Sequence, residues 1–154
     1  MSVSVRIPTA EDIPAYMDLA AAFVAKTPIS HIVPFDRQGT AEFVLAALDN
    51  PNMLILVAEE AGKIIGITGA LSYPMYFNPS KLVAQELWWY LTPSARGGPA
   101  SKMLFQTIEK WAKAIGAEAM FMIALSNERV DTMEKVYKRS GYAPVERTYV
   151  KGLI

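Results

Sequence analysis

The sequence predicts one domain of the mixed α+β class, in which helices flank a single mixed sheet. A length of 154 residues suits one such domain and leaves room for a sizeable core. The composition, 52% hydrophobic and 19% charged, is typical of a folded globular chain. Strand and helix patterns alternate only in the second half, which argues against a regular doubly wound sheet. We therefore expect residues 1–154 to share one core.

The N-terminal part is expected to contain one strand and two helices. Residues 3–7, VSVRI, alternate as a short strand, and Thr9 with Asp12 forms an approximate capping box for the helix that follows. A second helical pattern over residues 39–49 ends before Pro51, because the residue before a proline avoids the helical conformation. The predicted order is thus strand, helix, helix.

Three strands are expected next. The apolar runs on either side of residues 60–63, EAGK, predict a β-hairpin with a tight turn. Residues 76–82, YFNPSKL, are interpreted as a loop. Residues 84–92 then form an aromatic strand that ends at Pro93, since proline lacks the amide proton that a strand ladder needs.

The second half continues with helix, strand, helix and strand. Residues 100–115 place apolar side chains at helical spacing, and Gly116 supplies a C-terminal stop. Residues 117–125 read as a buried strand, residues 130–140 as a helix, and residues 143–153 as one long or two short closing strands. The prediction is therefore a mixed sheet of six or seven strands with about four helices.

The charge balance and the rare residue types exclude several classes of function. Fifteen Lys and Arg residues balance fifteen Asp and Glu residues, so we expect no overall field that attracts nucleic acid or an anionic membrane. The chain has no cysteine and one histidine, His31, which argues against thiolate and histidine-cluster metal sites. No signal peptide and no membrane span are predicted, and we expect a soluble, cytoplasmic protein.

The turn between the aromatic strand and the third helix, residues 96–102 with the sequence RGGPASK, raises the question of anion binding. The first amides of a helix lack partners within the helix and point outward, and glycines let a ligand approach the backbone. The turn is neither a Walker loop nor a dinucleotide fingerprint, because neither glycine pattern is present. On these residues alone, a phosphate site and an ordinary strand–helix connection both remain open.

Two motifs resemble the GNAT superfamily of acyl-CoA-dependent N-acyltransferases. Residues 90–104, YLTPSARGGPASKML, are similar to its central strand, Arg/Gln-x-x-Gly-x-Gly/Ala turn and helix, and residues 137–142, YKRSGY, resemble its C-terminal motif. The order of elements over nearly the whole chain also matches. Two departures are Pro99, where the family has a glycine, and Ser101, where it has Gly or Ala. Pro99 removes one amide donor from the turn.

The resemblance implies a GNAT fold and a site for acetyl-CoA as the acyl donor, with no metal. The pantetheine arm would pair with the backbone of the aromatic strand, and the pyrophosphate would lie on the turn. The residues implied in binding are Trp89, Tyr90, Leu91, Arg96, Gly97, Gly98, Ala100, Ser101, Lys102 and Asn127. For Asn127, a bond to the pantetheine and a cap on the following helix are both open.

Two residues are candidates for proton transfer. Tyr137 matches the tyrosine that, in the family, gives a proton to the departing thiolate, and a phenol with a pKa near 10 is protonated at neutral pH. The alternative interpretation of Tyr137 is a tyrosine that only packs on one face of an amphipathic helix. Glu86 could serve as the base that deprotonates the amine, or could be a solvated carboxylate at a strand end. His31 is a weaker candidate because it lies in a proline-bounded loop without a partner.

The resulting prediction is an N-acetyltransferase that transfers the acetyl group of acetyl-CoA to a primary amine by direct attack in a ternary complex. Two other hypotheses are an acyl-CoA sensor with weak or lost turnover, and a generic nucleotide-binding module. The acceptor and the acyl chain length are left open, and a homodimer is plausible from the family. Residues that could line an acceptor pocket, or pack in the core, are Trp88, Trp89, Tyr73, Met75, Tyr76 and Phe77.

Overall fold

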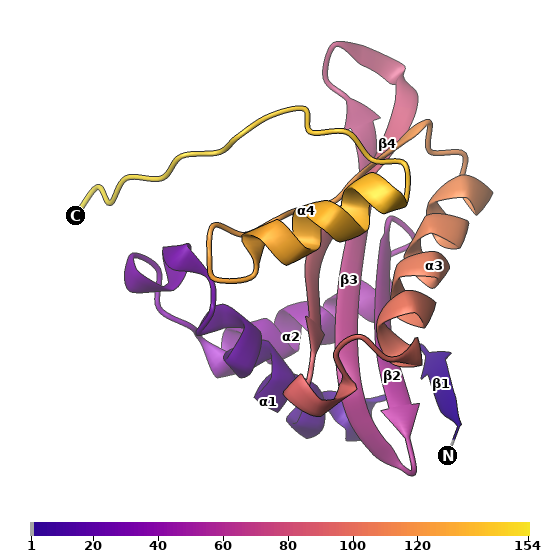
Figure 1. Ribbon diagram of the computed structural model, residues 1–154, viewed down its shortest axis with the longest axis vertical. Helices are drawn as coiled ribbons and strands as arrows, with labels where there is room; N and C mark the ends of the chain where they lie inside the picture. The colour runs from indigo at the N-terminus through magenta and orange to yellow at the C-terminus, as the bar shows by residue number, and fades with distance from the viewer. Residues whose placement is uncertain (1) are drawn as a thin grey trace.

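The computed structural model describes residues 2–154 and shows one five-stranded sheet with helices on both faces (Figure 1). The strands are β1 (Val3–Arg6), β2 (Met53–Glu60), β3 (Lys63–Met75), β4 (Asn78–Leu91) and β5 (Ala119–Phe121). The helices are α1 (Ile13–Val24), α2 (Arg37–Leu48), α3 (Pro99–Ala114) and α4 (Val130–Arg139). The spatial order follows the chain, β1 to β5; the first four strands are antiparallel to their neighbours, and β5 is parallel to β4. The mixed α+β class is confirmed.

The sheet separates two hydrophobic cores. On one face, α1 and α2 cover alternate residues of the sheet, including Ile55 and Val57 of β2 and Ile67 of β3. On the other face, α3 packs against Leu56 and Ala58. The continuous apolar run in β2 therefore reflects a strand that is buried on both faces. In Figure 1, α1 and α2 lie on one side of the sheet, and α3 and α4 lie on the other.

The predicted hairpin between β2 and β3 is confirmed. Ala61 and Gly62 both have positive φ angles, 51° and 75°, which is the conformation of a two-residue turn that matches the twist of the strands. The helix stop predicted at Gly116 is also present, and Gly141 follows α4 in the same way; their φ angles are 84° and 90°. The Thr9 amide donates to a carboxylate oxygen of Asp12 at 2.7 Å, as the capping-box pattern predicts.

The loop predicted over residues 76–82 is wrong, because β4 begins at Asn78 and forms a second hairpin with β3. The register shifts between Pro74, opposite Leu82, and Met75, opposite Asn78. This irregularity leaves extra residues on β4 around Pro79, where a missing amide proton breaks no ladder bond. The turn formers in the sequence thus mark an irregular place within a strand.

The predicted closing strands are also wrong within the described chain. Residues 143–154 form no strand, and β5 covers only three of the nine residues predicted for its strand, 117–125. The sheet therefore has five strands, fewer than the six or seven expected. A strand needs a neighbour to accept its backbone hydrogen bonds, and an apolar pattern does not show whether a neighbour is within reach.

Candidate active site

The central feature of the site is the place where β4 parts from β5. The two strands pair at only three positions, Val83 with Ala119, Ala84 with Met120 and Gln85 with Phe121. Beyond this point β4 continues to Leu91, and no strand lies on that side of it in the described part of the chain. The backbone of the last residues of β4 is thus open to a ligand that can pair like a strand.

A β-bulge lies where the two strands part. Ala70 of β3 pairs with Glu86, whereas the preceding Gly69 pairs with Trp88, so Leu87 is an extra residue on β4. A bulge bends its strand and redirects the side chains on either side. Partners in a register share a face, so Glu86 points with Ala70 toward the α3 side, and Trp88 points toward the α1 and α2 side.

The turn that follows β4 leads directly into α3. Gly97 has a φ angle of 76°, which disfavours any side chain, and a Cβ on Gly98 would lie 3.3 Å from the Ala95 carbonyl oxygen. Gly98 is the N-cap of α3, and Pro99 is its first residue. Proline is well suited to this position because its amide would have no partner within the helix. Pro99, unusual against the family motif, is therefore compatible with the turn.

The amide donors left at the start of α3 are those of Ala100 and Ser101. The Gly98 amide donates to the Ala95 carbonyl within the turn, and Pro99 has no amide proton. The next two amides come before the first regular bond of the helix and lie at the positive end of its dipole. Ala100 itself is buried, whereas Lys102 is exposed on the first turn.

Arg96 folds back onto the end of β4. Its Nε donates to the Leu91 carbonyl at 3.2 Å, and its guanidinium lies 5.4 Å from the centre of the Tyr90 ring. This arrangement links the turn to the last two residues of β4 through a hydrogen bond and a cation–π contact. The terminal guanidinium nitrogens keep further donors for an anion.

Glu86 is a buried carboxyl group, 4% exposed. Burial raises the pKa of Glu86 to about 8, and a hydrogen bond from the Ile123 amide opposes the rise. One carboxyl oxygen, Oε2, is buried without a hydrogen-bond partner in the protein. The alternative of a solvated strand-end carboxylate is therefore wrong, and Glu86 is a titratable group near neutral pH.

Tyr137 projects from α4 toward Ile123, the residue whose amide bonds to Glu86. Its hydroxyl donates to the Ile123 carbonyl at 2.7 Å, so the amide of Ile123 lies toward Glu86 and its carbonyl accepts from Tyr137. Burial, followed by the nearby charge of Glu86, raises the pKa of Tyr137 above its usual value. The structure thus brings both predicted proton-transfer residues together around Ile123, a residue that the sequence did not single out.

Aromatic rings hold Tyr137 in position. Its ring centre lies 6.4 Å from that of Trp89, 6.5 Å from that of Phe105 and 6.1 Å from that of Tyr142. The Tyr142 hydroxyl donates to Glu109 of α3 at 2.9 Å. This contact fastens the segment after α4 to α3, and with it the end of α4 that carries Tyr137.

Most of the buried polar side-chain atoms that lack a hydrogen-bond partner lie along the C-terminal part of β4. Among the described residues, the side-chain atoms of this kind are Thr27 Oγ1, Glu86 Oε2, Trp89 Nε1 and Thr92 Oγ1. Three of the four lie on β4 or on the residue after it. Because buried polar groups are nearly always hydrogen-bonded, each such atom needs an explanation, and a polar ligand is one.

A small apolar cavity lies on the opposite face of the sheet. It has a volume of about 110 Å³, and its lining side chains come from α1, α2, β4 and the segment before α2. They are Tyr16, Ala20, Phe23, Val24, Phe35, Thr40, Val44 and Trp88. The Trp88 indole nitrogen donates to the Tyr16 hydroxyl at 2.6 Å, which fixes the ring that forms one wall.

The other residues proposed for an acceptor pocket are scattered. Tyr76 and Phe77 are 86% and 71% exposed at the tip of the β3–β4 hairpin. The Tyr73 hydroxyl donates to Gln85 at 2.9 Å. His31, considered as a base and not as a pocket residue, is exposed at the end of a short 3₁₀ turn. Of the six aromatic and methionine residues considered, Trp88 lines the apolar cavity and Trp89 joins the aromatic group around Tyr137.

Asn127 makes two contacts within the protein. Its Oδ1 accepts from the Arg129 amide at 2.9 Å, and its Nδ2 donates to the Lys26 carbonyl at 3.0 Å. The first contact shapes the turn into α4, and the second ties that turn to the end of α1. The N-cap of α4 is Arg129, so Asn127 shapes the turn before the helix and does not cap it as expected, while contact with a ligand stays a prediction.

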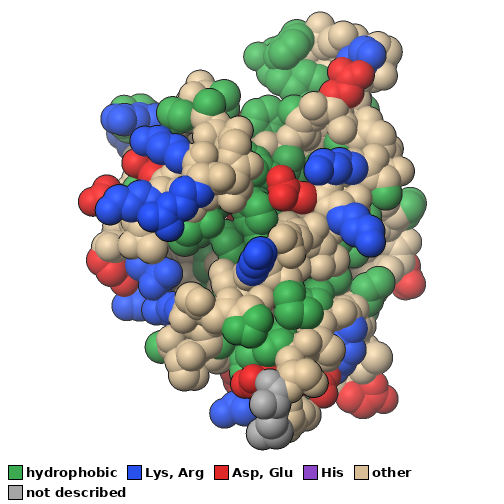
Figure 2. All heavy atoms as spheres, turned by 45° about the vertical axis from the view of Figure 1, so that its right-hand side comes forward, with side chains coloured by type: hydrophobic (Ala, Val, Ile, Leu, Met, Phe, Trp, Pro, Cys, Tyr) green, Lys and Arg blue, Asp and Glu red, His purple; other side chains and the backbone are tan. Residues whose placement is uncertain are grey.

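Acidic and basic side chains are mixed on the face of the molecule drawn in Figure 2. Apolar side chains lie between them. Within residues 2–154, no three His, Asp or Glu side chains are grouped so that they could hold a metal ion. Over the same residues, no helix is both long and apolar enough to cross a membrane.

Solved structures with the same fold include several acetyltransferases. One is the aminoglycoside acetyltransferase AAC(6')-Iy in complex with the bisubstrate analogue CoA-S-monomethyl-acetylneamine, which has a TM-score of 0.76 and 17% sequence identity to this chain. The superposition covers 98% of this chain and 97% of that chain. AAC(6')-Ih from Acinetobacter baumannii gives 0.75 at 16% identity, with 99% of each chain covered. A ribosomal-protein-alanine N-acetyltransferase from Brucella melitensis biovar Abortus 2308 gives 0.71 at 15%, covering 97% of this chain and 98% of its own.

Sequence comparison identifies the family. The uncharacterized N-acetyltransferase YhfO of Bacillus subtilis (strain 168) is 29% identical over 110 residues, which cover 70% of this chain and 70% of that protein. The family model described as Acetyltransferase (GNAT) family matches residues 19–142, a range that starts within α1 and includes the bulge, the turn and α4. The chain belongs to the GNAT acetyltransferase family.

Proposed function

We propose that this chain is a single-domain N-acetyltransferase that transfers the acetyl group of acetyl-CoA to a primary amine by direct attack in a ternary complex. The observation that carries the proposal is the row of buried, unpartnered polar atoms on Glu86, Trp89 and Thr92 beside the unpaired end of β4. A ligand with amide groups that enters the opening between β4 and β5 would supply the missing partners. Acetyl-CoA has such amides in its pantetheine arm and supplies the activated acetyl group as a thioester.

The binding roles follow the geometry of β4 and the turn. The backbone of Trp89, Tyr90 and Leu91 would pair with the pantetheine arm, and an amide near Leu91 would stabilise negative charge on the carbonyl oxygen during attack. The amides of Ala100 and Ser101 would bind the pyrophosphate at the start of α3. Gly97 and Gly98 would let it approach, and Arg96 and Lys102 would add positive charge.

The catalytic roles follow the arrangement around Ile123. Glu86 would accept a proton from the ammonium form of the acceptor, directly or through water, because only the neutral amine can attack. Its raised pKa, about 8, brings it closer to the pKa of an amine than an ordinary carboxylate would be. Tyr137, protonated at neutral pH, would give a proton to the departing thiolate once its hydroxyl turns from the Ile123 carbonyl.

The apolar cavity beside Trp88 suggests the kind of acceptor. It lies on the face opposite α3, so an acceptor there would approach the opening between β4 and β5 from the side away from the pyrophosphate turn. Its lining contains no charged side chain. We therefore propose an amine with an apolar group small enough for a cavity of about 110 Å³.

One arrangement favours a second candidate, an acyl-CoA-binding protein with weak turnover. The Tyr137 hydroxyl and the Arg96 Nε both bond to backbone carbonyls, of Ile123 and Leu91. A protein that kept these bonds with its ligand bound would bind acetyl-CoA but protonate no thiolate. Both candidates bind acetyl-CoA, and they differ in whether the protein transfers its acetyl group efficiently.

The test compares binding and turnover in the same preparation. Protein freed of copurified CoA should melt at a higher temperature with acetyl-CoA, because a ligand of the folded state alone raises the midpoint. A panel of amines with apolar and polar substituents should then yield an acetylated product by mass spectrometry. Binding without any product would favour the second candidate, and the absence of binding would contradict both.

A further inference from the structure

Trp88 forms the β4 wall of the apolar cavity that α1 and α2 line from the other side. Its indole nitrogen donates to the Tyr16 hydroxyl at 2.6 Å, and its ring meets that of Phe43 edge to face at 6.4 Å between centres. Its backbone carbonyl accepts from the Thr68 hydroxyl at 2.8 Å. Trp88 is thus held from α1, from α2 and from β3.

A glycine opposite Trp88 makes room for the indole ring. Gly69 of β3 pairs with Trp88, and a Cβ built on Gly69 would lie 2.4 Å from Cζ2 and 2.6 Å from Cε2 of the ring. Non-bonded carbon atoms do not approach so closely, since their optimal separation is about 3.5–4.0 Å. A side chain at position 69 would therefore push the ring away from the sheet and into the cavity. The pair of Gly69 and Trp88 sets how much of the cavity stays open.

The volume of the cavity limits the group that it can hold. It measures about 110 Å³, and its lining is apolar apart from the hydroxyls of Tyr16 and Thr40. An apolar protein cavity of about 150 Å³ binds benzene, which has six carbon atoms, so about 110 Å³ accommodates about four. A charged group would lose its hydration there without gaining a partner. The cavity therefore suits a short hydrocarbon chain.

The amine at the end of such a chain can reach the region of Glu86. Trp88 follows Glu86 by two positions on β4, and two extended residues span about 7 Å. β5 pairs with β4 only as far as Gln85, and within residues 2–154 no other strand lies beside Trp88 on that side. The hydrocarbon chain can thus stay in the cavity while the nitrogen lies in the opening between β4 and β5.

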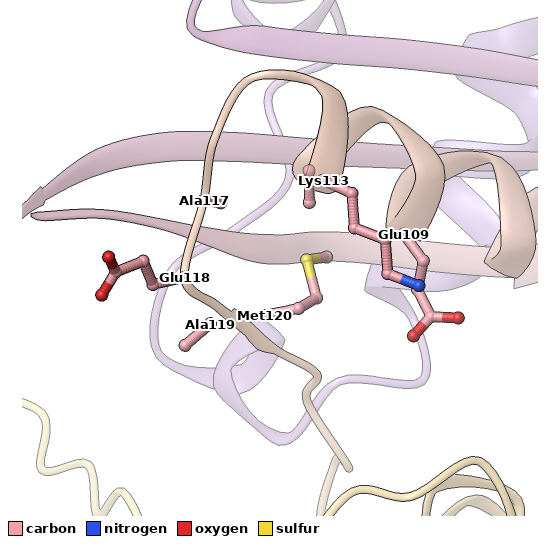
Figure 3. Close-up of a pocket in the computed structure, with 7 residues that line it drawn as sticks. Glu109, Lys113, Ala117, Glu118, Ala119 and Met120 are labelled. Carbon is pink, nitrogen blue, oxygen red and sulfur yellow. The ribbon is translucent and has the colours of Figure 1, made fainter.

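A second hollow, of about 120 Å³, lies between β5 and the C-terminal end of α3 and has a charged lining. Figure 3 shows Met120 of β5 pointing toward Glu109 and Lys113 of α3. Glu118 lines this hollow as well, so a hydrocarbon chain would displace water from three charged side chains there. The two spaces are similar in size and differ in chemistry, so a change at Met120 provides a comparison for changes at Trp88.

We propose that Trp88, seated over Gly69, restricts the acceptor to primary amines with an uncharged hydrocarbon chain of about four carbon atoms. This inference rests on the proposed function, because it names the acceptor class of the same site. In the reaction, the amine nitrogen bonds to the acetyl carbon as the carbon–sulfur bond breaks. The ammonium form of the acceptor loses two protons in all, of which one ends on the CoA sulfur and one passes to solvent. Acceptors with a longer chain leave part of it outside the cavity.

The first test measures kcat/KM for a series of unbranched primary amines, from ethylamine to octylamine, at saturating acetyl-CoA. The value should rise about fourfold for each added methylene up to butylamine and fall for hexylamine and octylamine, whose chains exceed the cavity. Trp88→Ala, which removes the ring, should move the maximum to longer amines, and Gly69→Ala should move it to shorter ones. Met120→Ala is the matched control and should keep the wild-type profile. Acetylated amine with the same profile in all four proteins overturns the inference and leaves the proposed function intact.

The second test follows amine binding without acetyl-CoA, so it distinguishes failure of the inference from failure of the proposed function. The indole N–H resonance of Trp88, assigned by its absence in Trp88→Phe, is observed in the full ¹⁵N-labelled chain during titration with butylamine and with hexylamine. We expect a saturable shift, with an affinity for butylamine about tenfold or more above that for hexylamine. Such binding without any acetylated product would contradict the proposed function alone. A resonance that does not respond to butylamine, or that responds equally to both amines, overturns the inference.

Discussion

Replacing Glu86 with glutamine should make the stability of the protein much less dependent on pH. The pKa of Glu86 is raised from 4.5 to about 8 by burial, so the folded state holds its proton in a range where the unfolded state has lost it. The sign follows from linkage: a raised pKa stabilises the folded state below pH 4.5, and this contribution is lost as the pH rises toward 8. The wild type should therefore become less stable across the neutral range.

The size of the effect follows from the two pKa values. Each pKa unit corresponds to about 1.4 kcal/mol, and integration between pH 5.5 and 7.5 gives a loss of about 2.5 kcal/mol attributable to Glu86. The neutral amide of Glu86→Gln fits the same space and cannot ionise. The stability of the variant relative to wild type should thus rise by about this amount over the two pH units.

Urea denaturation at pH 5.5, 6.5 and 7.5 measures the difference. Glu134→Gln, which alters an exposed carboxylate on α4, is the matched control and should track the wild type at every pH. Parallel pH dependence in the wild type and Glu86→Gln would refute the reasoning, because it would mean that Glu86 ionises in the folded protein as it does in the unfolded chain.

Three further predictions concern the proposed site. Tyr137→Phe keeps the ring and removes the hydroxyl proton, so it should lower kcat by about 10²-fold or more while the Kd for acetyl-CoA changes little. Steady-state kinetics measures kcat and calorimetry measures Kd; a similar loss in both would contradict the proton-donor role. Ser101→Pro removes a backbone amide at the start of α3 and should weaken CoA binding by about tenfold or more, whereas the control Ser101→Ala should have a smaller effect; equal affinities would argue against the turn as the pyrophosphate site. With the amine acceptor held at saturation, kcat/KM for acetyl-CoA should rise with pH through an inflection near 8, and this inflection should be absent in Glu86→Gln. If the variant keeps the inflection, the titrating group is not Glu86.

The sequence predicted those parts of the fold that depend on local patterns. The turn at Ala61 and Gly62, the helix from Pro99 and the stop at Gly116 each follow from residues within a few positions of one another. The β3–β4 hairpin is not predicted by local pattern, because Asn78 and Pro79 are turn formers and favour a loop in isolation. Cross-strand pairing overrides such local preferences.

The sequence suggested residues for the site but not the contacts that join them. Tyr137 is proposed from the resemblance to the family, and Glu86 from its place on the central strand and the need for a base. Their shared neighbour Ile123 contributes backbone groups, which have no signature in the sequence. The apolar cavity joins residues from α1, α2 and β4 that are far apart in the chain. Non-local contacts of this kind appear only when the chain is folded.

The most direct test of the proposed function is the release of free thiol from acetyl-CoA, followed with a colorimetric thiol reagent. The protein has no cysteine, so every thiol detected comes from CoA. We predict thiol release that depends on an added primary amine, matches the acetylated amine found by mass spectrometry, and falls about 10²-fold or more in Tyr137→Phe. Protein that neither binds acetyl-CoA nor releases thiol with any amine of the panel would contradict the proposal.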